Sequence, residues 1–235
     1  MRRGFTLVEL MIVIAIVAVI AALAVPALMA SQRSSNERSA SSALKTVATA
    51  EADFKGNDRD GNRIRDFWTR DLSGLFTVCP IGYSDPLKLI EVTLCGADSA
   101  PQGTGASPAN GTQVSVSYFT SSSPKSGYWF LAVPTDDAGN PYAQNTGGTA
   151  PFDQPWFNQT NYAFLAYPET RNIGRQIYFV NEENTILRRA LVGNVRPPGA
   201  TPPGAALIAA GAAGTSPLLS WPTPAQLRSD YSKLD

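Results

Sequence analysis

The sequence predicts an α+β protein in which a long N-terminal helix, hydrophobic and then amphipathic, packs on an antiparallel β-sheet. Residues 10–30 are almost wholly apolar, and residues 40–54 continue with apolar side chains at steps of three, four and seven. Farther along, short segments rich in β-branched and aromatic residues alternate with Gly, Pro and Asn. A helix followed by a run of strands is typical of the α+β class.

Length and composition exclude several function classes. The 235 residues allow one sizeable globular domain and an additional long element. Lys and Arg number 19, as do Asp and Glu, so the formal net charge is zero and we expect no nucleic-acid partner. The sequence has no His, which excludes Ser/His/Asp and Cys/His nucleophile systems, and no GxSxG, P-loop or HExxH motif. We therefore expect no enzyme.

The N-terminal segment predicts a membrane span. From Phe5 to Met29 the only ionisable side chain is Glu9, and an apolar run of about 20 residues can cross a bilayer as a helix. Arg2 and Arg3 would hold its start in the cytoplasm and leave the globular part outside. Since no small-residue cleavage site follows the apolar run, removal of the whole segment as a secretory signal is the weaker interpretation.

Residues 4–9, Gly-Phe-Thr-Leu-Val-Glu, resemble the cleavage motif of type IV prepilins and type II secretion pseudopilins. The resemblance implies cutting between Gly4 and Phe5 by a prepilin peptidase, N-methylation of Phe5 and retention of the apolar helix. The expected organisation is a leader at 1–4, a helix at 5–55 (5–30 in membrane or filament core, 31–55 amphipathic) and a globular pilin-like domain at 56–235.

Glu9 and Pro26 are the two unusual residues of the apolar helix. An ionisable group inside a membrane helix is costly and usually has a partner. The resemblance implies that this partner is the α-amino group of Phe5 in a neighbouring subunit, and the alternative is that Glu9 simply reaches the membrane surface. Pro26 lacks an amide donor, so it should kink the helix or let it unwind locally when subunits pack.

The remainder of the chain predicts the sheet. We expect the helix to end at Lys55-Gly56-Asn57 and strands at 114–119, 128–133, 162–167, 176–180 and 185–189. A polar four-residue connection joins the last two as a hairpin. Residues 67–78 and 87–94 suit either a short helix or a strand. Segments 97–111 and 196–214 predict loops, although the second also suits a short buried helix.

Cys79 and Cys95 are the only cysteines, and they lie in the part expected outside the cytoplasm, where thiols oxidise readily. We expect a disulfide, which would close a loop of roughly 17 residues and stabilise the fold by about 3 kcal/mol. The alternative is two separately buried thiols.

A candidate calcium site follows the helix. Oxygen-bearing side chains alternate at Asp58, Asp60, Asn62 and Asp66, and the Ile64 carbonyl completes the spacing found in calcium loops. Glycine stands at the fourth position of this loop instead of the sixth, no Glu follows at the twelfth, and three Arg reduce the negative field. The alternative is therefore a solvated, salt-bridged turn. No cofactor other than calcium is expected.

Aromatic side chains gather near the predicted strands, where they suit either core packing or a sugar- or peptide-binding platform. They are Tyr128, Trp129, Phe130, Trp156, Phe157, Tyr162 and Phe164. We favour the core, because aromatics at alternating strand positions usually fill the layer between sheet and helix.

The resemblance implies a structural subunit of a type IV pilus-like filament or a type II secretion pseudopilus. Its expected partners are identical or homologous pilin subunits, the prepilin peptidase, an inner-membrane assembly platform and membrane lipid. It would be a single-pass protein of the bacterial inner membrane that later enters a pilus or periplasmic pseudopilus. The alternatives are a membrane-tethered minor or tip subunit that binds a surface, an exported substrate or DNA, and a tethered carboxylate hydrolase.

Overall fold

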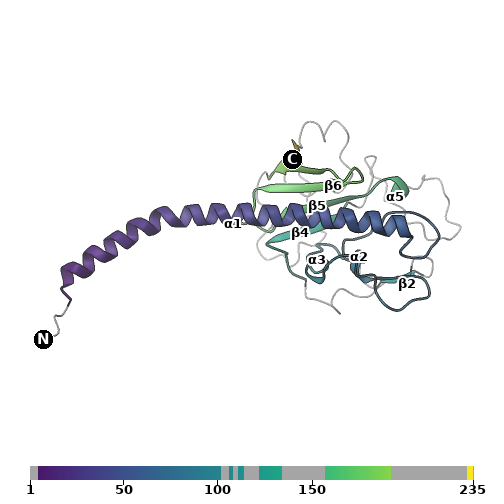
Figure 1. Cartoon of the computed structure of the whole chain (residues 1–235), viewed down its shortest axis with the longest axis horizontal. Helices are drawn as coiled ribbons and strands as arrows, with labels where there is room; N and C mark the ends of the chain where they lie inside the picture. Colours follow the sequence, from purple (N-terminus) through teal and green to yellow (C-terminus); the bar gives the residue numbers. More distant parts are fainter. Residues whose placement is uncertain are drawn as a thin grey trace.

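The computed structural model describes residues 5–101, 106–107, 111–113, 122–133, 157–191 and 232–234. A long helix projects from a globular body that is built on the C-terminal half of that helix (Figure 1). The body contains a five-stranded antiparallel sheet. The predicted α+β architecture is confirmed for the described part of the chain.

Helix α1 spans Leu7–Asn57, which is about 76 Å at 1.5 Å per residue. It ends at Asp58, whose φ of 47° is left-handed and whose amide donates to the carbonyl oxygens of Phe54 and Lys55. The helix thus ends within the expected segment Lys55-Gly56-Asn57, but the left-handed residue that stops it is Asp58 rather than Gly56 or Asn57.

Pro26 lies inside α1, and the helix continues through it. Figure 1 shows the N-terminal half as a gradual curve rather than a sharply bent rod. A proline removes only one backbone hydrogen bond from a helix, which so long an element can tolerate. Local unwinding between packed subunits stays a prediction.

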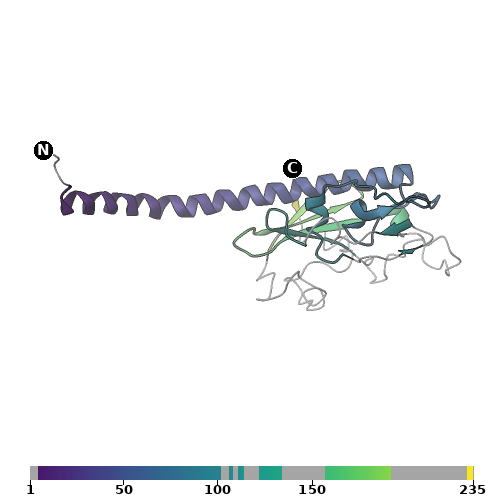
Figure 2. The same ribbon diagram turned by 90° about the horizontal axis from the view of Figure 1, so that it is seen from below.

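The main sheet lies along one side of α1 (Figure 2). Its spatial order is β4 (Tyr128–Ala132), β5 (Ala163–Pro168), β6 (Gln176–Asn181), β7 (Ile186–Ala190) and β8 (Ser232–Lys233). All neighbours are antiparallel, and β6 and β7 form the predicted hairpin with Val180 opposite Ile186. Four of the five predicted strands are confirmed, and the fifth, at 114–119, lies outside the described residues.

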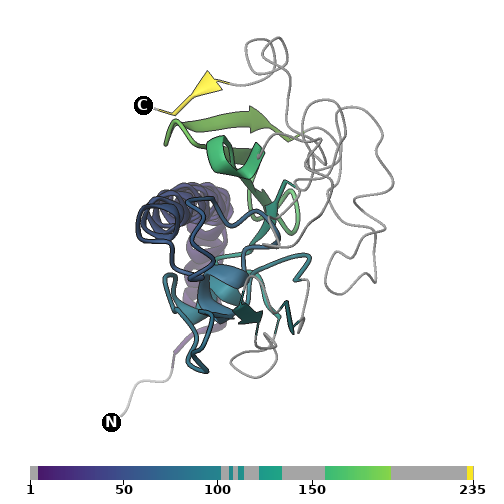
Figure 3. The same cartoon turned by 90° about the vertical axis from the view of Figure 1, so that its right-hand side faces the viewer.

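Several short elements complete the described part of the body. They are α2 (Gly74–Thr77), β1 (Val78–Cys79), α3 (Val92–Cys95), β2 (Ala106–Ser107), β3 (Gly111–Gln113) and α5 (Phe157–Thr160). Strands β1, β3 and β2 pair in that order as a small antiparallel sheet. Figure 3, seen along α1, shows α2 and α3 on one side of the helix and β6 and β7 on the other. The two ambiguous segments thus contain short helices, and β2 and the first residue of β3 lie in segment 97–111, which we expected to be loop.

Strands β4, β5 and β6 of the main sheet are buried on both faces. Alternate side chains of a strand point to opposite faces, and in β4 Phe130 faces α1 whereas Trp129 faces away. The face toward α1 joins Leu44, Val47 and Phe54 of the helix in one hydrophobic core. The opposite face forms a second cluster that includes Leu165 and Phe179.

The aromatic residues belong to these cores. Tyr128, Trp129, Phe130, Tyr162 and Phe164 are each at most 2% exposed. Core packing is therefore confirmed for these five. Trp156 and the side chain of Phe157 lie outside the described residues.

Candidate functional site

The N-terminal half of α1 presents its apolar side chains to solvent. Each residue from Phe5 to Gln32 is exposed, with Phe5 at 83% and Leu23 at 76%. Within the described residues, α1 is the one helix long and apolar enough to span a membrane by length and composition, and its most apolar window has a mean hydropathy of 3.0. Exposed apolar surface of this size marks a contact with lipid or protein.

The body holds α1 from Arg33 onward. The turn between β5 and β6 reaches this part of the helix through three hydrogen bonds: Arg33 Nε to Asn172 O (2.9 Å), Asn36 Nδ2 to Ile173 O (3.3 Å) and Arg175 N to Glu37 Oε1 (2.8 Å). The first fully packed helix residue is Ala40. The exposed and packed halves of α1 therefore meet at residues 33–40.

Glu9 caps its own helix. Its Oε2 accepts hydrogen bonds from Thr6 N at 2.9 Å and Thr6 Oγ1 at 2.8 Å, while Glu9 N donates to Thr6 Oγ1 at 3.3 Å. This reciprocal pair is a capping box, which satisfies amide groups at the helix start. We missed this role in the sequence, although Thr6 three positions before Glu9 is its signature. Gly4 lies outside the described residues, and Pro26 lies in the exposed half.

Residues 58–66, which we call the aspartate loop, follow α1 directly and curl back on themselves. Three side chains accept amide hydrogen bonds within the loop: Arg63 N to Asp58 Oδ2 (3.0 Å), Asn62 N to Asp60 Oδ1 (3.4 Å) and Ile64 N to Asn62 Oδ1 (2.6 Å). Arg63 has a φ of 67°. The sixth position of the loop thus takes the left-handed conformation that glycine provides in calcium loops.

The structure brings the acidic groups of the aspartate loop close enough to affect one another. Asp60 and Asp66 are each 3% exposed. Burial raises the pKa of Asp60 to about 7, and the charges of Asp66 and Asp58 add to the shift. Burial also raises the pKa of Asp66 to about 7, although a hydrogen bond from Asn158 favours its charged form.

The loop has features of the solvated, salt-bridged turn that was the alternative in the sequence, because its Arg59 is exposed and forms an ion pair. Arg59 forms its ion pair with Asp53 of α1, at 2.8 Å, rather than with a carboxylate of the loop. Arg63 and Arg65 are exposed. Positive charge therefore lies on the outside of the loop, and Asp60 and Asp66 lie inside.

The expected disulfide between Cys79 and Cys95 is not formed, and this corrects the prediction. Both cysteines are buried and free in the described part of the chain. Their sulfur atoms point to different carbonyls, Cys79 Sγ to Ser84 O at 3.2 Å and Cys95 Sγ to Ser73 O at 3.9 Å. Burial raises the pKa of Cys95 to about 12, which disfavours the thiolate needed for disulfide exchange. The two cysteines are the separately buried thiols of the alternative.

A second group of buried acids, which sequence analysis missed, organises the start of α2. Asp98 Oδ2 accepts from Ser73 N at 2.7 Å, and Asp71 Oδ1 accepts from Gly74 N at 2.9 Å. Burial and the charge of Asp71 raise the pKa of Asp98 to about 7. Both carboxylates satisfy amide groups at a buried helix start, so their role is structural. The available signal was Asp71 three residues before Gly74, a spacing typical of helix caps.

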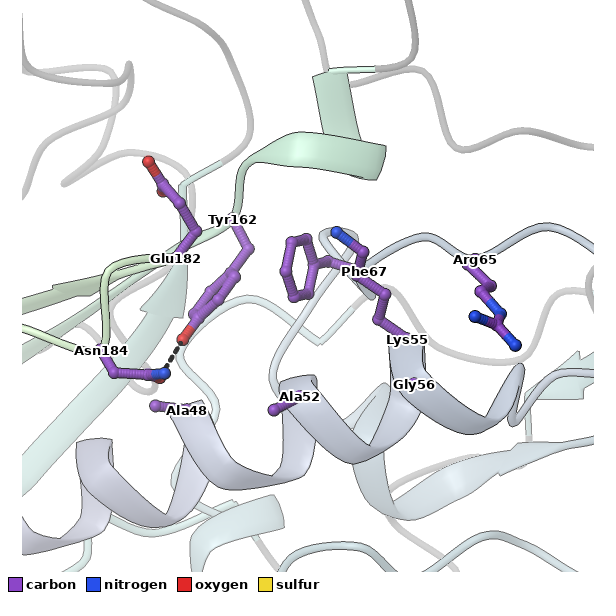
Figure 4. Close-up of a pocket in the computed structure, with 9 residues that line it drawn as sticks. All are labelled: Ala48, Ala52, Lys55, Gly56, Arg65, Phe67, Tyr162, Glu182 and Asn184. Carbon is purple, nitrogen blue, oxygen red and sulfur yellow. Dashed lines mark hydrogen bonds between the residues drawn. The ribbon is translucent and has the colours of Figure 1, made fainter.

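A pocket of about 300 Å³ lies between the end of α1 and the β6–β7 turn (Figure 4). Lys55 Nζ donates to Gln159 O at 2.6 Å and lies 4.3 Å from the centre of the Phe67 ring. Across the pocket, Tyr162 Oη donates to Asn184 Oδ1 at 3.1 Å. Glu182 also lines the pocket, and its buried Oε2 has no hydrogen-bond partner among the described residues.

Comparison with known proteins identifies the N-terminal segment. No curated protein and no solved structure matches the chain. Residues 1–25 match the family model of the prokaryotic N-terminal methylation motif, which marks structural, normally non-enzymatic proteins of the pilin type. The matched segment includes Phe5, Glu9 and the start of the exposed half of α1. The chain therefore carries the N-terminal methylation motif that is the hallmark of type IV pilin and pseudopilin prepilins.

Proposed function

We propose that this protein is a structural subunit of a type IV pilus-like filament or type II secretion pseudopilus. A prepilin peptidase cuts it between Gly4 and Phe5, Phe5 is N-methylated, and an inner-membrane assembly platform adds it to other pilin subunits through α1. One observation supports this best. A helix that begins with the methylation motif exposes every residue from Phe5 to Gln32, although these residues are mostly apolar.

Before assembly, lipid would cover this surface. Residues 5–30 would extend about 39 Å as a helix, which exceeds the roughly 30 Å of hydrocarbon in a bilayer. The body is held from Arg33 onward, so it would lie directly outside the membrane. Arg2 and Arg3 favour the cytoplasm for the N-terminus. The proposed precursor is therefore a single-pass inner-membrane protein with its globular part outside the cytoplasm.

In the filament, the exposed halves of neighbouring helices would pack on one another in place of lipid. Cleavage after Gly4 creates a positive amine on Phe5, and Glu9 of an adjacent subunit can pair with it. The capping box with Thr6 already holds the Glu9 carboxylate at the helix start, so little side-chain freedom remains to be lost. A charge-assisted hydrogen bond between amine and carboxylate would set the stagger of subunits.

Two substitutions at Glu9 separate the charge from the cap. Glu9→Gln keeps an oxygen that can accept from Thr6 N but removes the charge, whereas Glu9→Leu removes both. We expect both variants to insert into the membrane and both to be lost from sheared filaments, by at least about tenfold relative to the parent, because a charge pair is worth more than about 1.4 kcal/mol here.

The matched control is Thr6→Val, which removes the side-chain half of the cap and leaves the charge of Glu9. This variant should still enter filaments. If Glu9→Gln assembled normally while Glu9→Leu did not, Glu9 would act only as a cap, and the proposed pairing with Phe5 would be wrong. Mass spectrometry of the mature chain checks processing: we expect a start at N-methyl-Phe5, and an intact Met1 or a start beyond Ala27 would contradict the proposal.

A further inference from the structure

The end of the body from which the exposed half of α1 leaves carries arginines that the proposed filament function does not use. We call Arg33 of α1 and Arg171 and Arg175 of the β5–β6 turn the arginine patch. We propose that the arginine patch binds the phosphate groups of anionic phospholipids in the membrane leaflet outside the cytoplasm. This inference rests on the proposed membrane span of α1 and names a partner for the part of the body beside it.

The depth of the arginine patch follows from the length of the apolar run. Residues 10–30 are almost wholly apolar and would rise about 32 Å as a helix, which matches the roughly 30 Å of hydrocarbon in a bilayer. Arg33 would lie about 4.5 Å beyond this run along the helix axis. A bilayer of about 40–45 Å with its headgroups leaves roughly 5–7 Å for the headgroups on each side. Arg33 should therefore lie at the level of the lipid phosphates.

The fold brings the other two arginines to the same end of the body. Arg33 Nε donates to Asn172 O at 2.9 Å, so the β5–β6 turn contacts the helix at this residue. Arg171 and Arg175 lie on either side of Asn172 in the turn, and both are exposed. Arg175 N donates to Glu37 Oε1 at 2.8 Å, which ties the turn to the helix a second time. Figure 2 shows the exposed half of α1 leaving the body toward the N-terminus at this end.

The guanidinium groups of the arginine patch have donors available for a ligand. Among the described residues, Arg33, Arg171 and Arg175 form no ion pair. The side chain of Arg33 is held through Nε by a backbone carbonyl, and its two Nη groups donate to no described residue. A guanidinium can give two parallel hydrogen bonds to the oxygens of one phosphate. A group already fixed in place loses less conformational freedom when it binds.

Nearby acidic groups do not cancel the charge of the arginine patch. The chain contains no acidic residue between Glu9 and Glu37, and Glu37 already accepts an amide hydrogen bond from the turn. Glu169, just before the turn, is half-buried and has an interaction partner. Glu91 is paired with Lys125. Three cations thus face two carboxylates, and both carboxylates have contacts of their own.

The position beside the span favours lipid over a free anion. A dissolved phosphate would meet the arginine patch in water, where salt screens exposed charges. The span would instead hold the patch next to a dense layer of headgroups, which raises their effective concentration. Basic residues close to a membrane surface are attracted by anionic lipids. Phospholipid phosphates should therefore bind far better than inorganic phosphate, and they would hold the body upright on the membrane before assembly.

The test compares the lipids that stay bound to the full chain in detergent micelles with equal amounts of phosphatidylglycerol and phosphatidylcholine. Native mass spectrometry counts both lipids. We expect the parent to retain phosphatidylglycerol in clear excess, and Arg171→Gln combined with Arg175→Gln to lower the ratio about tenfold, because two cations are lost from the headgroup layer. Both side chains are exposed, so the Tm of this variant should equal that of the parent.

The matched control is Arg63→Gln combined with Arg65→Gln. These two arginines are also exposed, and they follow the other end of α1, so this variant loses the same charge far from the proposed membrane surface. It should keep the lipid ratio of the parent. The inference is overturned if the parent shows no preference for phosphatidylglycerol, or if both double variants lower the ratio equally.

Hydrogen exchange of the full chain in nanodiscs shows where the lipid acts. Amides of residues 169–176 should exchange more slowly with phosphatidylglycerol than with phosphatidylcholine alone, and inorganic phosphate added to the latter should not reproduce this protection. Equal protection by inorganic phosphate would mean that the patch is only a general anion site and would contradict the lipid assignment. If residues 10–30 are protected but 169–176 do not respond to the lipid, this inference fails and the span stands. Free exchange at 10–30 would contradict both.

Discussion

The two halves of α1 belong to one continuous helix but differ in what surrounds them. Residues 7–32 are all exposed, whereas the half that follows buries Leu44, Val47 and Phe54 against the sheet. Each half also contains one critical glutamate. Glu9 is exposed and caps its own helix, whereas Glu51 is fully buried and accepts from Trp68 N at 2.9 Å, and burial raises its pKa well above the ordinary value.

This difference shows that apolar composition alone does not determine what a helix face does. Leu23 and Leu44 are the same residue type on the same element, yet Leu44 is fully buried whereas Leu23 is 76% exposed. The packed half contributes to the stability of the body, and the exposed half contributes nothing to it until lipid or other subunits are present. The two halves should therefore respond differently to the same substitution.

The largest expected contrast comes from Leu44→Ala and Leu23→Ala. Leu44→Ala should lower the free energy of unfolding of the body by about 3 kcal/mol, because it removes a fully buried side chain and leaves a cavity. Leu23→Ala should change it by less than about 0.5 kcal/mol. Denaturant unfolding of the full chain in micelles measures both. Equal costs would mean that the body contacts the N-terminal half after all.

A change of pH should alter the stability of the packed part of the molecule alone. The pKa of Asp98 is about 7 in the folded protein against an ordinary 3.8, so the folded state keeps a proton that the unfolded chain releases between these values. Stability should therefore be greatest below about pH 4 for this group and fall steadily as pH rises to 7.

Asp98→Asn isolates this group from Glu51, Asp60 and Asp66, which titrate in the same direction. The variant should be less stable overall, since one amide cannot accept from both Ser73 N and Ala100 N, but its stability should fall less steeply from pH 4 to 7. Chemical unfolding at several pH values in excess EDTA measures the slope. An unchanged slope would show that Asp98 ionises normally.

The junction between the halves can be loosened at Gly174. A Cβ added there would lie 2.0 Å from Tyr128 Oη, and Tyr128 is fully buried, so the turn that holds Arg33, Asn36 and Glu37 would have to move. Gly174→Ala should cost about 1.5 kcal/mol. Hydrogen exchange at residues 33–40 should rise in parallel; unchanged exchange there would separate this turn from the anchoring of the helix.

Sequence patterns predicted the parts of this structure that follow from local chemistry. The apolar run, the steps of three and four after Ala40, and the period-two strands each depend on near neighbours along the chain, so the long helix and β4 to β7 were accessible. The methylation motif was equally accessible because Gly4, Phe5 and Glu9 lie within six consecutive residues.

The features that were missed depend on contacts between distant segments. The sequence shows two cysteines in an oxidising context, but not that their sulfurs face the carbonyls of Ser84 and Ser73. It shows three arginines beside the aspartates, but not that Arg59 turns back to Asp53. Asn158 lies 92 positions from Asp66, and only the fold brings them together. Side-chain direction, rather than residue type, decided each of these cases.

The smallest expected effect concerns the far end of the packed half, at Gly56. In the structure Gly56 is helical and a Cβ would meet nothing within 4 Å, so Gly56→Ala should stabilise the body by about 0.5–1 kcal/mol, since glycine costs that much in a helix interior. If the helix ended at Gly56 instead, this glycine would carry the left-handed conformation and alanine would cost about 1 kcal/mol. The sign of the change in denaturant midpoint therefore decides where α1 stops. Stabilisation would agree with Asp58 as the left-handed cap. Destabilisation would indicate that the helix ends two residues earlier and that Asp58 does not lie at the start of the aspartate loop.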